Sequence, residues 1–438
     1  MASLLHELRA APDLTDDDVL RRTLQGVFGL SEFREGQAWA IKRVLQGKST
    51  LLVAPTGTGK SLCYQLPAVL LPGLTLVVSP LISLMQDQMA HLPSCIRAAC
   101  FTGKQTLEEM DDTLRRLRDR AIDILFVSPE RLMTNRFRTL VANRAVFPPV
   151  SLACIDEAHC LSEWSHNFRP AYLRLRQALV EEVRAGAVLA LTATATVPTK
   201  ATLCSVLALP EEGVLSHMPH RPNLGFTANR VRGDDDATRA LLKLVCSKEL
   251  KHAKSIIVYV TTQAAADSLT DYLKNKGGLS ARKYHGGMSS KGRARVQTAF
   301  MKGTVRIVVA TVAFGMGIDK ANVRAVIHYH LPRSLEDFVQ QAGRAGRDGK
   351  PARCHVFLDE DQYRLLRALA HSDGVSTHQI HGLTALVWEA AATAAPGAAI
   401  IIPHRQLQDK LNLKPSVAET LLHCMQGRGL LSVEPSVW

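Results

Sequence analysis

Short apolar runs alternate with helix-like stretches along most of this 438-residue chain. The first series of runs covers residues 50–54, 74–79, 122–128, 151–155 and 188–192. Turn or polar residues bound each run, and helical stretches such as 107–120 lie between them. Parallel strands that are buried on both faces have this pattern, because crossover helices cover both sides of such a sheet. The pattern therefore predicts a βαβ series with a parallel sheet.

A second series of apolar runs follows at residues 255–260, 281–284, 306–310, 325–330 and 353–358. Residues 211–236 are expected to form the junction, so the fold class is α/β with two tandem parallel-sheet domains. The predicted divisions are 1–39 (a helical N-terminal region), 40–212, 213–358 and 359–438. In the last of these, helices at 405–411 and 417–426 and a strand at 430–434 have an order consistent with a winged-helix-like module.

The positive charge is concentrated in the second of these domains. Residues 213–358 carry 24 Lys and Arg against 10 Asp and Glu, while the net charge of the whole chain is +13. Such an excess predicts a polyanionic partner, since neutralising phosphates releases counterions. Charge alone fits an unpartnered basic surface equally well.

Other features of the sequence limit where the protein works. Nine cysteines stand singly, without a C-x-x-C pair, which predicts free buried thiols in a reducing compartment. No apolar stretch is long enough for a membrane span, and the first residues do not resemble a secretory signal.

A phosphate-binding loop follows the first apolar run. Residues 54–61 read APTGTGKS, close to G-x-x-x-x-G-K-[ST] with Ala54 in place of the first glycine. A strand before it and a helix after it disfavour the alternative of a glycine-rich turn that binds nothing. We expect Lys60 to reach the β- and γ-phosphates and the Ser61 hydroxyl to bind Mg²⁺. The residues expected to hold the nucleotide are Thr56, Gly57, Thr58, Gly59, Lys60 and Ser61.

Two adjacent acids, Asp156 and Glu157, follow the apolar run 151–155. An acid at the carboxyl end of a parallel strand faces the ligand crevice, whereas a solvated surface pair would not follow a buried strand. We expect Asp156 to hold Mg²⁺ through its water shell and Glu157 to act as the general base toward the attacking water. Together with the phosphate loop, these acids predict an NTPase.

The Asp-Glu-Ala-His sequence at 156–159, placed after a phosphate loop, resembles the superfamily 2 helicases. Further stretches match that superfamily in order, at 79–88, 128–132, 191–196, 310–320 and 340–349. The aromatic-rich loop 160–170 and the segment 28–37 resemble the RecQ family, and the resemblance covers about residues 20–358. Ser165 and Asn167, together with the lack of a cysteine cluster after residue 358, resemble the fourth vertebrate, Rothmund–Thomson-type branch.

The resemblance implies two RecA-like domains and an ATP- and Mg²⁺-dependent 3′→5′ DNA helicase in the nucleus. By the same resemblance, Gln37 pairs with the adenine edge and Arg34 contacts the base. Across the cleft, Gln340 senses the γ-phosphate or positions water, Arg347 is the arginine finger, and Arg344 is shared between ATP and partner contacts. Gly317 and Asp319 would approach the nucleotide from the second domain.

The resemblance also implies the DNA contacts. Trp164 and Phe168 would stack on bases, Arg169 would bind a phosphate, and His166 would couple this loop to Glu157. The remaining expected DNA-binding residues are Ser79, Gln86, His285, Arg293 and Thr311. The implied partners are single-stranded DNA, tailed or forked duplex DNA, and replication or repair proteins. The protein itself is expected to be a monomer or a weak oligomer.

Two further questions concern zinc and the completeness of the motor. His371, His378 and His381, with Cys354, lack a standard zinc spacing, so we expect solvated histidines. Relative to a full-length member of that branch, the chain lacks a long N-terminal region and ends at Trp438, so we expect a fragment, a variant or a diverged homologue.

Two other functions stay open. One is an RNA helicase of the DEAD or DEAH type, which the loop 164–170 disfavours. The other is an ATP-gated scaffold or annealing module without unwinding, because no strand-separating wedge is identified and its candidates lie in residues 405–438.

Overall fold

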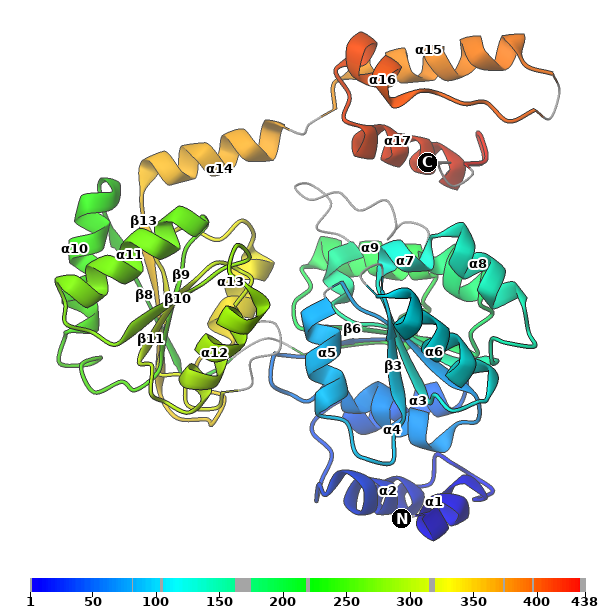
Figure 1. The fold of residues 1–438 in the computed structure, drawn as a ribbon, viewed down its shortest axis with the longest axis horizontal. Coiled ribbons are helices and arrows are strands. Elements are labelled where there is room, and N and C mark those ends of the chain that lie inside the picture. Colours follow the sequence, from blue (N-terminus) through cyan, green and yellow to red (C-terminus); the bar gives the residue numbers. More distant parts are fainter. Residues whose placement is uncertain are drawn as a thin grey trace.

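The computed structural model describes residues 2–80, 82–102, 105–161, 175–217, 221–314, 320–372, 375–395 and 398–433. Two α/β domains lie side by side, and a long helix leads from the second to a small helical unit at the C-terminal end (Figure 1). The predicted α/β class with two tandem parallel-sheet domains is confirmed.

The first domain is built on a seven-stranded sheet in the order β3-β4-β2-β5-β6-β1-β7, in which all pairs are parallel. Sequential strands thus cross over through helices, as the alternating runs predicted. The strands are β1 (Thr50–Val53), β2 (Leu74–Val78), β3 (Ala98–Phe101), β4 (Ile124–Val127), β5 (Val150–Ile155), β6 (Ala187–Thr192) and β7 (Val214–Ser216).

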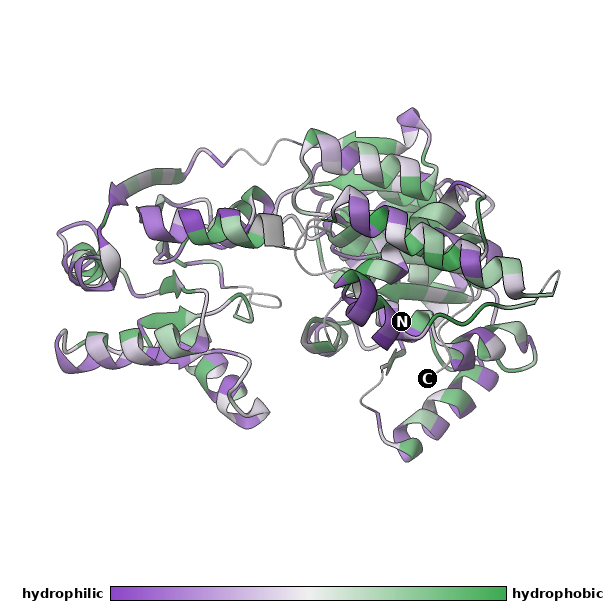
Figure 2. Ribbon diagram, turned by 90° about the horizontal axis from the view of Figure 1, so that it is seen from above, coloured by the Kyte–Doolittle hydropathy of each residue, from purple (hydrophilic) through white to green (hydrophobic). Residues whose placement is uncertain are grey.

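Helices cover both faces of this sheet and bury two separate cores. On one face Leu52 packs with α1 (Ala2–Arg9), α2 (Asp17–Phe28), α3 (Gln37–Leu45), α4 (Leu62–Leu70) and α5 (Ile82–Ala90). On the other face Leu51 and Val53 share a core with α6 (Leu107–Arg118), α7 (Pro129–Leu132), α8 (Asn135–Ala142) and α9 (Val197–Leu207). The short turns η1 (Ala158–Leu161) and η3 (Gln177–Glu182) join the second core. Because both faces are buried, the central strands are mostly apolar, as Figure 2 shows.

The second domain has a six-stranded parallel sheet in the order β10-β11-β9-β12-β13-β8. Its strands are β8 (Leu224–Arg230), β9 (Ile256–Tyr259), β10 (Ala281–Tyr284), β11 (Ile307–Ala310), β12 (Ala325–His328) and β13 (Ala352–Leu358). One face is covered by α10 (Gly233–Val245) and α11 (Gln263–Asn275), and the other by α12 (Ser290–Met301) and α13 (Leu335–Ala342).

The segment 211–236 is not the simple junction that the sequence predicts. After η4 (Glu211–Gly213), β7 pairs with β1, so the first sheet continues beyond residue 212, and β8 already belongs to the second sheet. Both strands lie at sheet edges, and most of β8 is exposed. An edge strand buries little surface and needs no apolar run, so the pattern that found the central strands missed these two and also β3.

The C-terminal residues form a helical unit. Helix α14 (Glu360–Ser372) leads to α15 (Thr377–Thr393), α16 (His404–Leu411) and α17 (Pro415–Gly427), whose small core is formed by Leu383, Leu386, Leu407, Leu413 and Ala418. The predicted strand 430–434 is wrong over 430–433, which follow the last helix without regular structure, and residue 434 lies outside the described residues. A strand needs a neighbouring ladder, and Leu430 is instead 68% exposed.

Two expectations about the whole chain can be compared with the structure. Over the described ranges, no helix combines the length and apolar character needed to span a membrane. All nine cysteines are free thiols. Burial is complete for Cys63, Cys154 and Cys354, four others are half-buried, and the expectation of burial is wrong for Cys246 and Cys424, which are exposed.

Candidate active site

The phosphate loop, residues 54–61, connects β1 to α4 at the carboxyl edge of the first sheet. Gly57 and Gly59 have φ of +84° and +72°, a left-handed backbone that favours glycine and curls the loop. Lys60 Nζ donates to the carbonyl oxygens of Ala54 at 2.8 Å and Pro55 at 3.2 Å, which holds the ammonium inside this curl. Burial lowers the pKa of Lys60, while Glu157 and Asp156 act in the opposite direction. The loop thus presents a desolvated cation beside two carboxylates.

Arg34 and Gln37 lie against the same loop. The Gln37 Nε2 amide donates to the carbonyl oxygens of Thr58 and Gly59, both at 2.9 Å, and Oε1 accepts from the Arg34 backbone N–H at 2.8 Å. The Arg34 guanidinium donates to the Gly57 carbonyl. Because both amide N–H groups are used by the loop, the contact seen here is support of the phosphate loop, and the reading of adenine stays a prediction.

We expect Gln37→Ala to weaken the binding of every nucleoside triphosphate and not of ATP alone. Loss of two neutral hydrogen bonds, at about 1 kcal/mol each, corresponds to roughly a 30-fold loss of affinity. Titration with ATP, GTP and inorganic tripolyphosphate checks this, with Gln25→Ala on exposed surface of α2 as the control. A loss confined to ATP would contradict loop support and favour adenine reading.

The two acids lie where β5 ends. Asp156 is 8% exposed and accepts a hydrogen bond from Gln88 Nε2 on α5 at 2.8 Å. Burial, with the adjacent Glu157 carboxylate, raises the pKa of Asp156 to about 6. Glu157 has φ of +52°, a backbone that non-glycine residues rarely adopt and that recurs at functional sites. Four other described residues that are not glycine have positive φ, but each of them follows the end of a helix, where this backbone is common. They are Arg120, Arg184, Ala208 and Asn412.

Residues of the second domain reach across to this site. Gln340 Nε2, on α13, lies 3.4 Å from Glu157 Oε1. The Thr56 hydroxyl donates to the Gly343 carbonyl at 3.0 Å. The Arg347 side chain lies against Gly57, since a Cβ on that glycine would be 3.4 Å from the Cδ and Nε of Arg347. The structure therefore brings Gln340 and Arg347 to the phosphate loop and its acids.

Arg344 lies elsewhere in the same segment. The Arg344 side chain is 6% exposed and hydrogen-bonds with the buried Tyr259 hydroxyl of the second domain. Burial raises the pKa of Tyr259, and the charge and hydrogen bond of Arg344 act against this rise. Of the two predicted arginines, Arg347 is thus placed against the phosphate loop, and Arg344 is placed beside Tyr259.

A chain of polar contacts leads from Glu157 to β6. His159 Nδ1 lies 3.3 Å from Glu157 Oε2 and 2.9 Å from the Thr192 hydroxyl. Thr192 in turn donates to the Thr194 carbonyl at 2.8 Å. This chain connects the acid at the end of β5 with the loop after β6.

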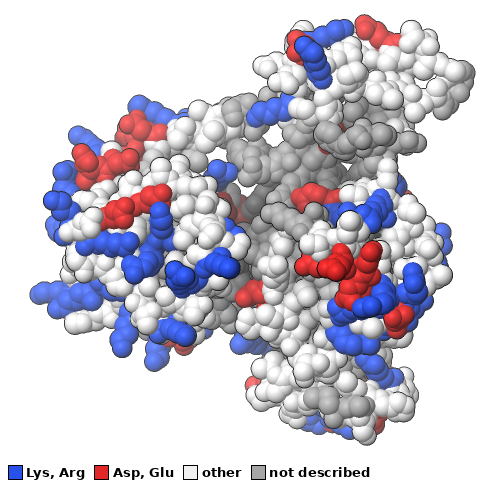
Figure 3. Space-filling model, viewed as in Figure 1, with Lys and Arg blue, Asp and Glu red and all other residues white. Residues whose placement is uncertain are grey.

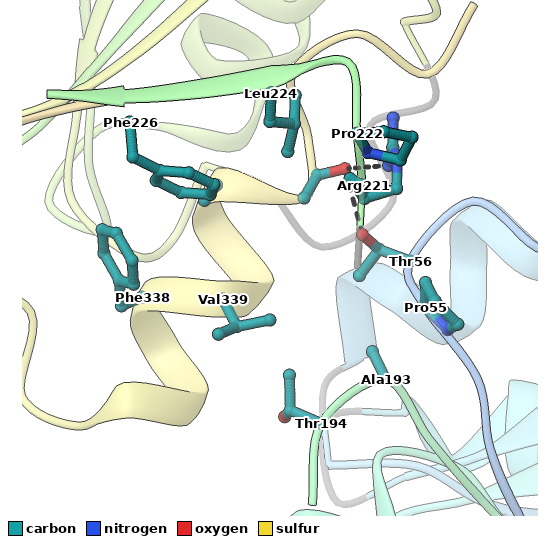
Figure 4. Close-up of a pocket in the computed structure, with 12 residues that line it drawn as sticks. Pro55, Thr56, Ala193, Thr194, Arg221, Pro222, Leu224, Phe226, Phe338 and Val339 are labelled. Carbon is teal, nitrogen blue, oxygen red and sulfur yellow. Dashed lines mark hydrogen bonds between the residues drawn. The ribbon is translucent and has the colours of Figure 1, made fainter. Parts of the chain in front are cut away.

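A cavity of about 410 Å³ lies between the two domains beside this loop (Figure 4). Pro55, Thr56, Ala193 and Thr194 line it from the first domain, and Phe226, Phe338 and Val339 face them from the second. Arg221 spans the end of the cavity and donates to carbonyls of the arginine-bearing segment, including Gly346 at 2.7 Å. The Thr56–Gly343 hydrogen bond thus joins the two domains beside a mostly apolar cavity.

Several predicted residues are placed away from this cluster or cannot be placed. Trp164, His166, Phe168, Arg169, Gly317 and Asp319 lie outside the described residues. Ser79 is buried at the end of β2, and Gln86 is exposed on α5. Thr311 follows β11 at the carboxyl edge of the second sheet.

The remaining two expected DNA contacts hold the turn after β10. His285 is buried with Nε2 3.1 Å from Asp267 Oδ1. Arg293 donates to the carbonyls of Gly286 at 3.2 Å and Met288 at 2.7 Å. In this structure both side chains order the turn, and their contact with DNA stays a prediction.

Sequence reasoning missed Gln88 as the partner of Asp156, Gly343 as the interdomain partner of Thr56, and Arg221 as a donor to the arginine-bearing segment of its own domain. Gln88 closes the stretch 79–88 that was matched to a helicase motif, so its position was a signal. The contact of Gly343 with Thr56 joins residues 287 positions apart, and nothing local predicts it.

The oxygen donors of Ser61 and Asp156 beside Lys60 fit a magnesium ion with bound phosphates, since Mg²⁺ prefers a few carboxylate or hydroxyl ligands plus phosphate oxygens. Over the ranges that the structure describes, no group of three or more His, Cys, Asp or Glu is close enough to hold a metal ion by itself. The expectation about zinc therefore stays a prediction.

Comparison with known proteins identifies the family. The DEAD/DEAH box helicase family matches residues 34–202, and the helicase conserved C-terminal domain matches residues 236–349. ATP-dependent DNA helicase Q-like 5 of Arabidopsis thaliana is 42% identical over 96% of this chain and 46% of its own length. Human ATP-dependent DNA helicase Q4 is 44% identical over 83% of this chain and 31% of its own length. The chain therefore spans less than half the length of these two relatives.

A shorter relative is covered more fully. The probable ATP-dependent DNA helicase RecS of Bacillus subtilis is 38% identical over 82% of this chain and 71% of its own length. The structure of Mycobacterium smegmatis helicase Lhr bound to ssDNA and AMP-PNP has a TM-score of 0.61 at 21% identity, covering 92% of this chain and 55% of that one. This likeness concerns the fold. The sequence relatives and the two family matches confirm the predicted resemblance, and the chain belongs to the RecQ family of helicases.

Proposed function

We propose that the protein is an ATP-dependent DNA helicase that moves 3′→5′ on single-stranded DNA and separates duplexes. The observation that carries this proposal is that two side chains of the second domain contact the nucleotide site of the first. Gln340 contacts Glu157, and Arg347 contacts Gly57 of the phosphate loop. A hydrolysis site shared between two domains makes the distance between them depend on the nucleotide, which is what a motor requires.

The chemistry follows from the residues in place. Gln340 donates to Glu157 Oε1, and the buried Oε2, which has no hydrogen-bond partner among the described residues, would accept the proton of the attacking water. Arg347 is positioned to stabilise charge that develops on the γ-phosphate. Magnesium, when bound, neutralises charge on the β- and γ-phosphates, and Ser61 and Asp156 are the residues that would hold it. The Thr192–Thr194 loop borders the interdomain cavity and would transmit closure to the rest of the first domain.

The choice of DNA rests on the relatives, which are named ATP-dependent DNA helicases, and on the predicted aromatic loop. Polarity rests on the family resemblance. Tailed or forked DNA, replication or repair proteins as partners, and a nuclear location follow from the same resemblance. They stay predictions, since the relatives include bacterial and eukaryotic proteins.

The test is the unwinding of a duplex with a 3′ single-stranded tail, beside its 5′-tailed twin, with ATP and Mg²⁺. We expect unwinding of the 3′-tailed duplex alone, and its loss in Lys60→Ala, because that side chain is the cation of the phosphate loop. Lys48→Ala, an exposed lysine before β1, is the matched control. Unwinding of the 5′-tailed duplex would contradict the polarity, and turnover stimulated by RNA over DNA would favour an RNA helicase.

One observation favours a second candidate, a DNA-stimulated ATPase that anneals or bridges DNA without unwinding it. The strand expected at 430–434 for a winged-helix-like module does not form over 430–433, so the C-terminal unit offers no wing in the residues described. ATP turnover stimulated by single-stranded DNA, without unwinding of either tailed duplex, would support this candidate.

A further inference from the structure

Positive charge lies at both edges of the second sheet. At the carboxyl edge are the expected DNA contacts His285 and Arg293, after β10, and Thr311, after β11, together with Lys291 and Arg295 on the first turns of α12. A separate row of lysines lies at the amino edge, in the loops that precede β9, β10 and β11 and in the last turn of α11. These lysines are Lys248, Lys251, Lys254, Lys274, Lys276 and Lys302, named here the lysine edge.

Hydrogen bonds fix these three loops side by side. The Arg306 guanidinium donates to the carbonyls of Val245, Leu250 and Ala253, which ties the loop before β9 to the start of β11. The Ser280 hydroxyl donates to the Thr304 carbonyl, which ties the loop before β10 to the loop before β11. The lysine edge is therefore one continuous surface on a rigid frame.

The charge of the lysine edge is nearly uncompensated. Two acids lie within it: Glu249 pairs with Arg353, and Asp271 lies 3.9 Å from Lys274. Lys248, Lys251, Lys254, Lys276 and Lys302 are exposed, and no ion pair found over the described ranges involves them. Figure 3 shows Lys and Arg gathered along the lower rim of the second domain, with its acids mostly higher, toward α10.

Part of this pattern has a local explanation. Lys276 and Lys302 are the C-cap residues of α11 and α12, where a cation is favoured by the negative end of the helix dipole. That effect accounts for one cation at a helix end. It does not account for Lys248, Lys251 and Lys254, which crowd one loop at a cost in mutual repulsion.

We infer that the lysine edge is a second DNA-binding surface, which holds the phosphate backbone of duplex DNA without reading its sequence. Lysine is a compact point charge suited to phosphate, and duplex DNA presents phosphates densely along both strands. Among the described residues, no aromatic side chain is exposed on this surface, which disfavours stacking on bases. Met301 is the large apolar side chain exposed there, which is too little for an apolar peptide anchor.

The two edges are opposite ends of the same strands. Strands β10 and β11 have four residues each, so their first and last Cα atoms lie about 10 Å apart at ~3.3 Å per residue. A single strand that follows the carboxyl edge therefore runs along a different edge of the sheet from the lysine edge. The inference goes beyond the proposed function, because binding here needs neither ATP turnover nor a single-stranded tail.

The test compares two quadruple variants of the full chain. Lys248→Gln, Lys251→Gln, Lys276→Gln and Lys302→Gln neutralise the lysine edge. The matched control removes the same charge from exposed positions that precede strands at the amino edge of the first sheet. Its substitutions are Lys48→Gln, Arg118→Gln, Arg144→Gln and Arg184→Gln. Binding of a short blunt-ended duplex without nucleotide is measured by fluorescence anisotropy from roughly 50 to 200 mM salt.

We expect the lysine-edge variant to bind the blunt duplex 10-fold or more weakly at the lower salt. Its slope of log affinity against log salt should be shallower by about 3 to 4, the value for four phosphate contacts. The control should match the wild type. The inference would be overturned if the lysine-edge variant kept the wild-type affinity and slope. It would also be overturned if this variant lost binding to a poly-glutamate peptide but still bound the duplex as the wild type does.

ATP turnover stimulated by a single-stranded oligonucleotide distinguishes this inference from the proposed function. Unchanged turnover in the lysine-edge variant, with weakened duplex binding, would show a folded motor and a separate duplex surface. Absence of turnover in the wild type would contradict the proposed function and leave the duplex-binding comparison intact.

Discussion

Replacing Arg347 by alanine should lower DNA-stimulated ATP turnover by about 10³-fold or more, with little effect on nucleotide affinity. An arginine that meets the γ-phosphate acts on charge that develops in the transition state, and such arginines contribute about 10³ to 10⁵ in kcat. The side chain already lies against Gly57 of the phosphate loop, in the range where it influences the pKa of Lys60. Binding of the ground state depends instead on Lys60 and on the backbone of the loop.

Single-turnover hydrolysis and equilibrium binding of ATP separate the two effects. Arg347→Lys is expected to recover only part of the rate, because an ammonium keeps the charge and lacks the planar fork of donors. Lys350→Ala, an exposed cation in the same segment, is the control. Turnover of Arg347→Ala within threefold of the wild type would contradict the assignment and direct attention to Arg344, which the structure places beside Tyr259.

How far the sequence predicted this molecule depended on whether the signal was local. The central strands were found because each buries both faces and must be apolar, and the phosphate loop was found because Gly57 and Gly59 occupy positive φ between a strand and a helix. Edge strand β8 was missed because exposed residues need no such pattern.

The parts that escaped prediction depend on contacts between distant segments. Gln37 was assigned to adenine by resemblance, whereas its amide is engaged by the loop carbonyls of Thr58 and Gly59. The Thr56–Gly343 hydrogen bond and the Gln88–Asp156 pair arise only when the sheets and domains are assembled. Counting charges likewise predicted a basic second domain but not which edge of its sheet carries the lysines.

Replacing Glu157 by glutamine should reduce ATP turnover by about 10²- to 10⁴-fold while ATP and Mg²⁺ still bind. The substitution keeps the size of the side chain and leaves an oxygen that can accept from Gln340 Nε2, now 3.4 Å from the carboxylate. It removes the proton acceptor for the attacking water. It also removes a negative charge that raises the pKa of Asp156, so Asp156 should ionise more readily and remain able to hold the metal.

The Glu157→Gln variant should therefore accumulate with ATP bound and the two domains held together. A fluorescent ATP analogue should bind with near wild-type affinity, single-turnover hydrolysis should be slow, and affinity for single-stranded DNA should still respond to ATP. Glu181→Gln, an exposed acid on η3, is the matched control and should leave all three unchanged. Loss of nucleotide binding together with turnover would show that Glu157 holds the metal or shapes the strained turn, and the role of general base would then pass to another residue.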